Sequence, residues 1–222
     1  MLPHPTWLLA ATMHSAAASQ CPSGVAVDLP IVERPLPPDP ERERLALQYL
    51  REHQGGNPTS TTIAPQVVVL HWTGSGSLNG AWNTFAPAAL SGRPELGAGA
   101  QVNVGAQYLV DRDGTVYRLL PDTAFARHTI GLNHVAIGVE NVGDGDRNPL
   151  TPAQVRANTL LVRQLCASLP IGWLIGHSEY RSLEGTPLFV EVDPDYRTVK
   201  PDPGAAFLAE VRAGVADLGL LP

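Results

Sequence analysis

The apolar run at residues 67–70 constrains the fold more than any other part of the chain. It reads Val-Val-Val-Leu without a polar interruption, and His71 follows it directly. A short continuous apolar run, unlike an alternating one, predicts a strand that is buried on both faces. Such a strand lies in a sheet whose two faces are covered by helices. The rest of the chain must then supply partner strands and helices for both faces.

Helix and strand signals alternate along the chain as this arrangement requires. Helices are expected over 41–53, after an N-cap at Asp39-Pro40, and over 151–169, where Thr151 and Gln154 form a capping box. Further helices are expected over 79–90 and 205–218. Strands are expected over 135–142 and 172–175, and as a hairpin over 102–110 and 115–120 around Asp113-Gly114. The sequence predicts an α/β fold, a central mixed β-sheet flanked by helices, with a cleft at the strand ends.

The composition limits the class of protein and its partners. Of 222 residues 44% are hydrophobic, which is enough for a packed core. The formal net charge of −6 argues against a nucleic-acid partner, because nucleic acid requires a basic face. Two cysteines, Cys21 and Cys166, cannot form a disulfide framework. One bridge between them is possible, but we expect Cys166 to pack as a small hydrophobe.

The first forty residues form two segments ahead of a folded domain over 41–222. Residues 7–13 are apolar and residues 15–19 are small, which resembles a signal segment over 1–20, although no Lys or Arg precedes it. Residues 21–40 are rich in proline and are expected to form an extended arm or linker. No apolar run approaches the roughly 20 residues of a membrane helix. We expect export to the periplasm or the extracellular space, with the cytoplasm as the alternative, and no integral membrane segment in the mature protein.

Two histidines and one aspartate form the strongest candidate site. His71 and His177 each follow an apolar strand segment, and ligand sites in open α/β sheets collect at such strand ends. Asp202 lies in the sequence Val-Lys-Pro-Asp-Pro-Gly, in which two prolines predict stiff, extended backbone. Two histidines and a carboxylate are a common ligand set of a catalytic zinc ion with an open position for water. Taken singly, either histidine is better interpreted as a capping or partly buried residue.

Lys200 and Glu140 are candidates for chemistry beside that site. Lys200 precedes Asp202 by two residues, so both side chains lean to one side if the backbone is close to β and splay if it is closer to polyproline II. A fixed cation beside the site could stabilise negative charge on an amide oxygen. A salt bridge from Lys200 to Asp195 is the alternative. Glu140 shares a strand face with an alanine and a glycine, which predicts open space in front of a general base or acid. A solvated strand face is the alternative for Glu140.

Other histidines and one further carboxylate carry less weight. His128 is expected to line the cleft or to bind substrate, and His134 to lie in a loop. His53 falls on a helix face. Glu179 either orients His177 as a hydrogen-bonded carboxylate or is exposed.

Five ordered segments carry a family resemblance: VVVLHWT, NVGAQYLVDRDGTVYRLLPDT, ARHTIGLNHVAIGVENVG, LIGHSEY and KPDPGAAF. Together they resemble the zinc-dependent N-acetylmuramoyl-L-alanine amidases, in the superfamily of type 2 amidases and peptidoglycan recognition proteins. The resemblance implies a mixed sheet with a zinc cleft, Zn²⁺ as cofactor, and peptidoglycan or muropeptides as substrate. It implies hydrolysis of the amide between N-acetylmuramic acid and L-alanine of the stem peptide.

The resemblance also implies a role for each candidate residue. His71, His177 and Asp202 correspond to the zinc ligands. Glu140 corresponds to the catalytic carboxylate of bacterial members, and Lys200 to the residue that stabilises the tetrahedral intermediate.

Other positions differ from the family pattern or bear on the substrate. His128 matches a region that lines the substrate groove in relatives and is no metal ligand. Phage-type members have a catalytic tyrosine where this chain has Ala106, so Glu140 must do that work. Gln107 stands where many relatives have histidine. The interval between the second and third ligands is longer than in compact members, which predicts an extra loop over 178–199 near the cleft.

Two other functions are compatible with this sequence. The first is a recognition module that binds cell-wall fragments without cleaving them, which related folds become after losing zinc ligands. All three ligands are present here, which favours the enzyme. The second is a zinc peptidase or amidase for another small amide, because specificity resides in the groove loops and not in the zinc site.

Overall fold

The computed structural model describes residues 28–92 and 100–222. The expected signal segment over 1–20, the first part of the proline-rich arm, and Cys21 lie outside the described residues. No helix in the described part of the chain has the length and hydropathy needed to cross a bilayer.

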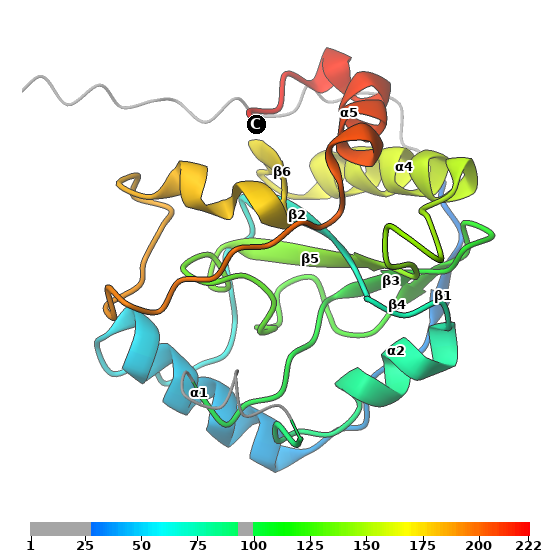
Figure 1. Ribbon diagram of the computed structural model, residues 1–222. Coiled ribbons are helices and arrows are strands. Elements are labelled where there is room, and N and C mark those ends of the chain that lie inside the picture. Colours follow the sequence, from blue (N-terminus) through cyan, green and yellow to red (C-terminus); the bar gives the residue numbers. More distant parts are fainter. Residues whose placement is uncertain (1–27, 93–99) are drawn as a thin grey trace, which may run out of the picture.

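A six-stranded mixed sheet lies at the centre of the molecule, in the order β1-β4-β3-β5-β2-β6 (Figure 1). The strands are β1 (Ile31–Glu33), β2 (Val67–Trp72), β3 (Tyr108–Val110), β4 (Val116–Arg118), β5 (Ala136–Asn141) and β6 (Trp173–Gly176). β2 pairs in parallel with β5 and with β6, and β3 pairs in parallel with β5. The β3–β4 hairpin is antiparallel. The predicted central mixed sheet is therefore confirmed.

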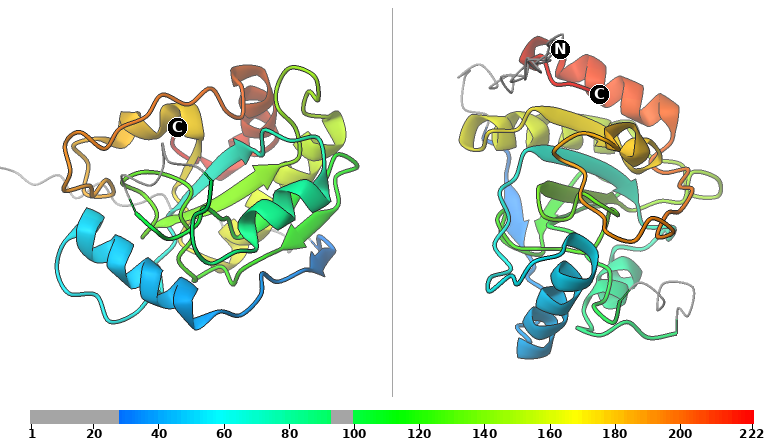
Figure 2. Two further views of the ribbon diagram at one scale, coloured as in Figure 1. Left: turned by 60° about the horizontal axis from the view of Figure 1, so that its bottom comes forward. Right: turned by 90° about the vertical axis from the view of Figure 1, so that its left-hand side faces the viewer.

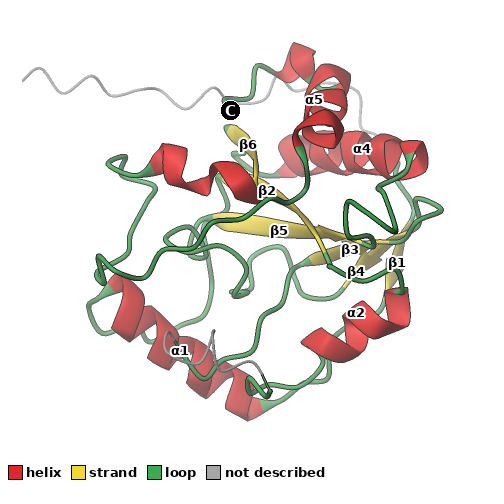
Figure 3. Cartoon of the chain, in the orientation of Figure 1, coloured by secondary structure: helices red, strands yellow, loops and turns green. Residues whose placement is uncertain are grey.

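Helices lie on both sides of this sheet (Figures 2 and 3). On one side are α4 (Pro152–Ser168) and α5 (Ala205–Gly214), and on the other are α1 (Pro40–Gln54) and α2 (Leu78–Phe85). A 3₁₀ helix, η1 (His177–Leu183), follows β6 directly. The layered arrangement agrees with the predicted α/β fold.

The run at 67–70 forms the centre of two hydrophobic cores. Val68 and Leu70 pack in a cluster with side chains from α4 and α5. Val67 and Val69 point to the opposite face and pack with residues of η1 and of the loop before β5. All four are fully buried, which confirms the prediction of a strand enclosed on both faces.

The predicted starts of two helices are confirmed together with their caps. The Asp39 carboxylate accepts a hydrogen bond from the Glu41 amide at 2.9 Å, and Gly55, with φ +75°, follows the end of α1. Thr151 Oγ1 accepts from the Gln154 amide at 3.2 Å, and Gln154 Oε1 accepts from the Thr151 amide at 2.9 Å. This reciprocal pair is the predicted capping box of α4.

Three predicted boundaries are wrong. The helix expected over 79–90 ends at Phe85; Ala86 still has helical backbone, but Pro87 has no amide hydrogen with which to continue the helix. The strand expected over 102–110 is limited to β3, because residues 102–107 leave the sheet and form isolated bridges to other loops. The helix expected over 205–218 breaks after Gly214 and continues as a separate 3₁₀ turn, Ala216–Leu218.

Two features were not expected from the sequence. Within the proline-rich arm, β1 pairs in parallel with β4 at the edge of the sheet. Cys166 of α4 is buried in the hydrophobic core, as expected. It is disulfide-bonded, however, so the expectation that it packs as a free thiol is wrong. A local sequence pattern describes the surroundings of a helix position without identifying a bonding partner elsewhere in the chain.

Gln154 links α4 to the sheet, because its Nε2 donates to the carbonyls of Val110 and Val142 at 3.1 and 3.0 Å in a fully buried position. Gln154→Leu removes both of these hydrogen bonds and the one from the Thr151 amide, although the Val110 carbonyl still accepts from the Val142 amide. We therefore expect the free energy of unfolding to fall by about 2–4 kcal/mol. Urea denaturation measures the loss. Gln48→Leu, on the surface of α1, is the control and should stay within about 0.5 kcal/mol of wild type. A loss no larger than that of the control would contradict the prediction.

Candidate metal centre

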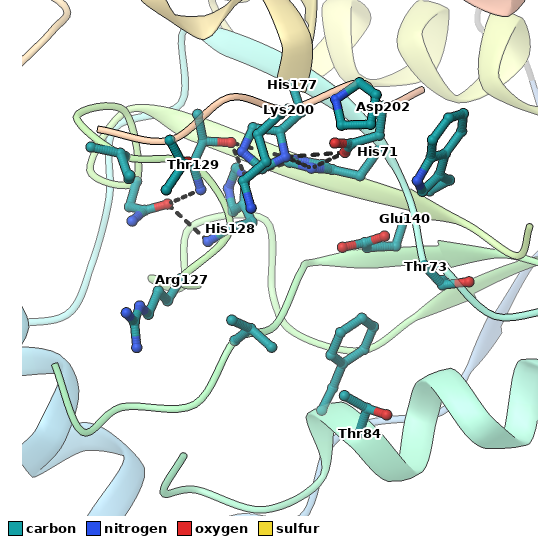
Figure 4. A pocket seen from close by; sticks show the side chains of 18 of the residues that line it. His71, Thr73, Thr84, Arg127, His128, Thr129, Glu140, His177, Lys200 and Asp202 are labelled. Carbon is teal, nitrogen blue, oxygen red and sulfur yellow. Dashed lines mark hydrogen bonds and ion pairs between the residues drawn. The ribbon is translucent and has the colours of Figure 1, made fainter. Parts of the chain in front are cut away.

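A cavity of about 400 Å³ opens at the carboxyl ends of β2, β5 and β6 (Figure 4). Because these strands are parallel, their carboxyl ends lie at the same edge of the sheet, where ligand sites of α/β folds collect. The structure brings together at this cavity all six residues singled out in the sequence, namely His71, His128, Glu140, His177, Lys200 and Asp202.

His71, His177 and Asp202 form a buried cluster on one wall of the cavity. His71 is the penultimate residue of β2, His177 opens η1 directly after β6, and Asp202 precedes α5. His71 Nδ1 lies 3.0 Å from His177 Nδ1 and 3.2 Å from Asp202 Oδ2, and His177 Nδ1 lies 3.0 Å from the same oxygen. The three residues are 2%, 7% and 6% exposed. Three ligand-type atoms therefore face one another at the corners of a small triangle.

This triangle suits a metal ion better than it suits a set of hydrogen bonds. Each Nδ1 carries at most one proton and an ionised carboxylate carries none, so at most two of the three contacts can be hydrogen bonds. A tetrahedral zinc ion with bonds of about 2.0–2.1 Å sets its ligand atoms about 3.3 Å apart, close to the separations observed here. The chemistry and spacing of the donor atoms therefore fit a divalent ion, and the cluster could hold one.

The protonation states also suit metal ligands. Burial, followed by the neighbouring His71, lowers the pKa of His177 to about 4, so its imidazole is neutral near pH 7. Burial raises the pKa of Asp202, but hydrogen bonds with His177 and His71 outweigh that effect and hold the pKa well below its usual value. A neutral imidazole and an ionised carboxylate are the forms that coordinate metals.

The segment over 198–204 is an extended strap that carries Lys200 and Asp202. Lys200 and Asp202 both line the cavity, as does the adjacent Val199, although Val199 is 94% exposed. Among the described residues no ion pair involves Lys200, and the alternative of a salt bridge to Asp195 is not observed.

Two hydrogen-bonded anchors join the strap to η1. The Tyr180 hydroxyl donates to the Thr198 carbonyl at 2.8 Å and accepts from the Thr198 amide at 2.9 Å. The Ser178 amide donates to the Asp202 carbonyl at 2.9 Å. Gly176 allows the close approach, because a Cβ there would lie 2.8 Å from a ring carbon of Pro203. The cluster of His71, His177 and Asp202 is thus held by one 3₁₀ helix that contributes His177 and fixes the strap at both ends.

Glu179 has a structural role that differs from both predictions. Its Oε2 accepts from the Gly176 amide at 3.1 Å and lies 2.6 Å from Arg212 of α5. It is half-buried and the structure gives it no hydrogen bond to His177. Glu179 therefore ties the start of η1 to α5 and does not orient the His177 ring.

Glu140 lies beside His71 on the neighbouring strand. The two residues are register partners in the parallel β2–β5 pair, so their side chains project from the same face of the sheet. Figure 4 shows the Glu140 carboxylate pointing into the cavity below His71 and Asp202. The space expected along this face is only partly open, because the His128 ring fills the position above Gly138. Glu140 therefore faces the cavity, whereas the space above Gly138, two residues earlier on the same face of β5, is occupied.

Several further residues at the cavity were not anticipated from the sequence. Tyr49 of α1, Asn133 and Tyr196 also line the cavity, and the Arg127 guanidinium lies over the Tyr49 ring. Arg127 is buried and donates to the Tyr196 hydroxyl at 2.9 Å, and Asn133 donates to the Tyr49 hydroxyl at 3.1 Å. Tyr49 lies on the buried face of α1, but no local signal in the sequence shows that this helix reaches the cavity.

The segment over 178–199, for which an extra loop was predicted, borders the cavity through Tyr196, Thr198 and Val199. It consists of most of η1 and an irregular segment that meets the C-terminal end of α1 before reaching the strap. His53 of α1 is buried, and its Nδ1 lies 3.0 Å from Glu191 Oε1 in this segment. The loop is therefore attached both to α1 and, through Tyr180, to its own first turn.

The fold and the site define an α/β protein with a candidate metal centre in a cleft at its strand ends. The chain belongs to the N-acetylmuramoyl-L-alanine amidase family, whose model matches residues 61–204. Among solved structures it is similar to the N-acetylmuramoyl-L-alanine amidase LysC from Clostridium intestinale, at 20% identity and a TM-score of 0.52, over 85% of this chain and 98% of LysC. It is also similar to bumblebee PGRP-SA, at 15% identity and a TM-score of 0.50, over 87% of this chain and 98% of that one. At such identities the similarity concerns the fold, and no curated protein matches in sequence.

Tyr180→Phe removes one hydroxyl and leaves the buried ring in place. We expect the Thr198 amide to lose its hydrogen-exchange protection and the free energy of unfolding to fall by about 1–3 kcal/mol, because the Thr198 amide and carbonyl both lose their partner. Exchange measured by mass spectrometry on the strap checks the local effect. Tyr108→Phe, a buried tyrosine of β3 that hydrogen-bonds Asp122, is the control and should leave exchange in the strap unchanged. Equal protection of Thr198 in wild type and Tyr180→Phe would contradict the proposed anchor.

Proposed function

We propose that this chain is a zinc-dependent hydrolase that cleaves the amide between N-acetylmuramic acid and L-alanine in peptidoglycan or muropeptides. Membership of the amidase family supports the reaction class. The observation that carries the proposal is the buried triangle of His71 Nδ1, His177 Nδ1 and Asp202 Oδ2, which shares one cavity with a carboxylate and a lysine. A binding module needs only a groove, whereas this cavity also brings a carboxylate and a lysine to the cluster, which supports a hydrolase.

His71, His177 and Asp202 would hold the zinc ion, and Glu140 would act as the general base and acid. When bound, zinc polarises a carbonyl and lowers the pKa of a water molecule from 15.7 to about 7. Glu140 would accept a proton from the attacking water and deliver it to the amine of the departing L-alanine. Its register position beside His71 places this carboxylate at the same edge of the sheet as the ligand cluster.

Lys200 would stabilise the negative charge that develops on the amide oxygen. It lies midway between the two anchors of the strap, so its backbone is fixed relative to Asp202. Its positive charge acts on the cluster, because it is one of the causes that lower the pKa of His177. A fixed cation aimed at developing charge requires little reorganisation during the reaction, which is the basis of oxyanion stabilisation.

The substrate would cross the cavity between two groups of loops. One wall includes Thr73 and Gly74 after β2, and the other includes Tyr196 and the strap. We propose that these walls hold the glycan and the stem peptide on either side of the cleaved bond.

Incubation of the purified protein with a defined muropeptide tests the function. We expect mass spectrometry to detect free stem peptide and the separated sugar, the reaction to stop when a chelator removes zinc, and zinc to restore it. Binding of the muropeptide without release of the peptide would favour a recognition module. Release of peptide from unrelated amides at an equal rate would favour an amidase of different specificity.

Glu140→Gln and Asp202→Ala separate the chemistry from metal binding. We expect Glu140→Gln to retain zinc and to lose turnover by roughly 10²–10⁴-fold, because the amide cannot take the proton. Asp202→Ala should instead lower zinc occupancy, because it removes one of three ligands. Turnover measurements and metal analysis of both variants check the assignment. Full activity of Glu140→Gln, or full zinc occupancy of Asp202→Ala, would contradict the role given to that residue.

A further inference from the structure

The side of His71 that faces away from Asp202 is in contact with a second histidine. His71 Nε2 lies 3.1 Å from His128 Nδ1, and the two rings meet edge to face at a centroid distance of 5.1 Å. His128 Nε2 in turn lies 3.3 Å from the carbonyl oxygen of Ala136. The hydroxyl of Thr129 lies 2.9 Å from His128 Nδ1 and 3.4 Å from His71 Nε2. A continuous polar chain therefore runs from the ligand cluster to the backbone of β5.

The direction of the hydrogen bonds in this chain follows from its two ends. If His71 binds a metal through Nδ1, its neutral ring must carry the proton on Nε2, which is then a donor. A carbonyl oxygen only accepts, so His128 must carry its proton on Nε2 and leave Nδ1 as the acceptor. Each ring then has a single tautomer. The N–H at His71 Nε2 donates a hydrogen bond to His128 Nδ1, or it donates to the Thr129 hydroxyl, which in turn donates to His128 Nδ1.

We propose that His128 is a positioning residue that fixes the tautomer and ring orientation of His71 for metal binding through Nδ1. The inference rests on the proposed zinc site. Metal-bound histidines in proteins usually donate their second nitrogen to a carboxylate, carbonyl or water, and loss of that partner typically costs 10–100-fold in metal affinity. In this chain an imidazole takes that place, itself oriented by the backbone of the neighbouring strand.

The surroundings of His128 are built to hold its ring in this position. The Asn133 side chain accepts hydrogen bonds from the amides of His128 and Thr129 at 3.0 and 2.8 Å, which fixes the backbone of the loop. Gly138 of β5 provides the space for the ring, because a Cβ there would lie 2.8 Å from His128 Cγ. Since both ring nitrogens are engaged within the protein, His128 has no nitrogen left with which to bind substrate.

Zinc affinity of His128 variants tests the proposal without using activity. Competition with a chromophoric chelator should show about 10–100-fold weaker zinc binding by His128→Ala than by wild type. His128→Asn, whose Oδ1 offers an acceptor near the place of Nδ1, should recover part of the loss. His134→Ala removes a half-buried histidine whose Nδ1 lies 2.8 Å from Gln54 Nε2, away from the cluster, and should bind zinc as wild type does.

A second pair of variants moves the His128 ring without removing it. Gly138→Ala should weaken zinc binding, because the added methyl group displaces the ring from His71. The double variant Gly138→Ala/His128→Ala should bind zinc no more weakly than His128→Ala alone, because the methyl group then has nothing to displace. Gly138→Ala by itself remains informative if His128→Ala does not fold.

The possible outcomes separate this inference from the proposed function. Wild-type zinc affinity in folded His128→Ala would overturn the inference, and a raised KM at unchanged zinc affinity would assign His128 to substrate binding instead. Failure of the wild-type protein to bind zinc would overturn the proposed function itself. Weaker zinc binding by His128→Ala and by Gly138→Ala, with normal binding by His134→Ala, would support the positioning role.

Discussion

The parallel pairing of β2 with β5 and β6 is the constraint on which the site depends. It sets the carboxyl ends of three strands at one edge of the sheet, where β2 supplies His71, β5 supplies Glu140 and the end of β6 delivers His177. Because side chains alternate along a strand, a shift of one residue between β2 and β5 would turn these groups to opposite faces. Residues 67–70 are all apolar, so no alternation of polar and apolar side chains fixes the register of β2. The side chains packed against both of its faces set the register instead.

Asp202 and Lys200 reach the same place by a different physical route. No strand carries them, and their segment has no regular secondary structure. Stiff proline-flanked backbone limits the shapes available to the strap, and hydrogen bonds from Tyr180 and Ser178 select one of them. The residue that begins η1, His177, belongs to the same rigid unit. Sheet register and a clamped strap therefore share the task of bringing the polar groups together.

Much of the architecture could be derived from local sequence, but the contacts of the cavity could not. The apolar run, the caps at Asp39 and Thr151, and the hairpin turn depend on neighbours within a few residues, which a pattern records. The residues of the ligand cluster were found from strand ends, proline spacing and family resemblance. The contact between His128 and His71, the reach of Tyr49 to the cavity, and the β1–β4 pair depend on packing between distant segments. Nothing in a local pattern encodes such distances.

The sequence separation of the three clustered residues has a consequence for the lifetime of the folded chain. An ion held by His71, His177 and Asp202 would act as a reversible crosslink, joining positions 106 and 25 residues apart. An ion that binds the folded chain and not the unfolded chain stabilises the fold, because its free energy of binding adds to that of folding. Depletion of the ion would thus deprive the molecule of reactivity and of resistance to proteolysis in a single event. Metal supply would then regulate how much of the protein persists as well as how fast it works.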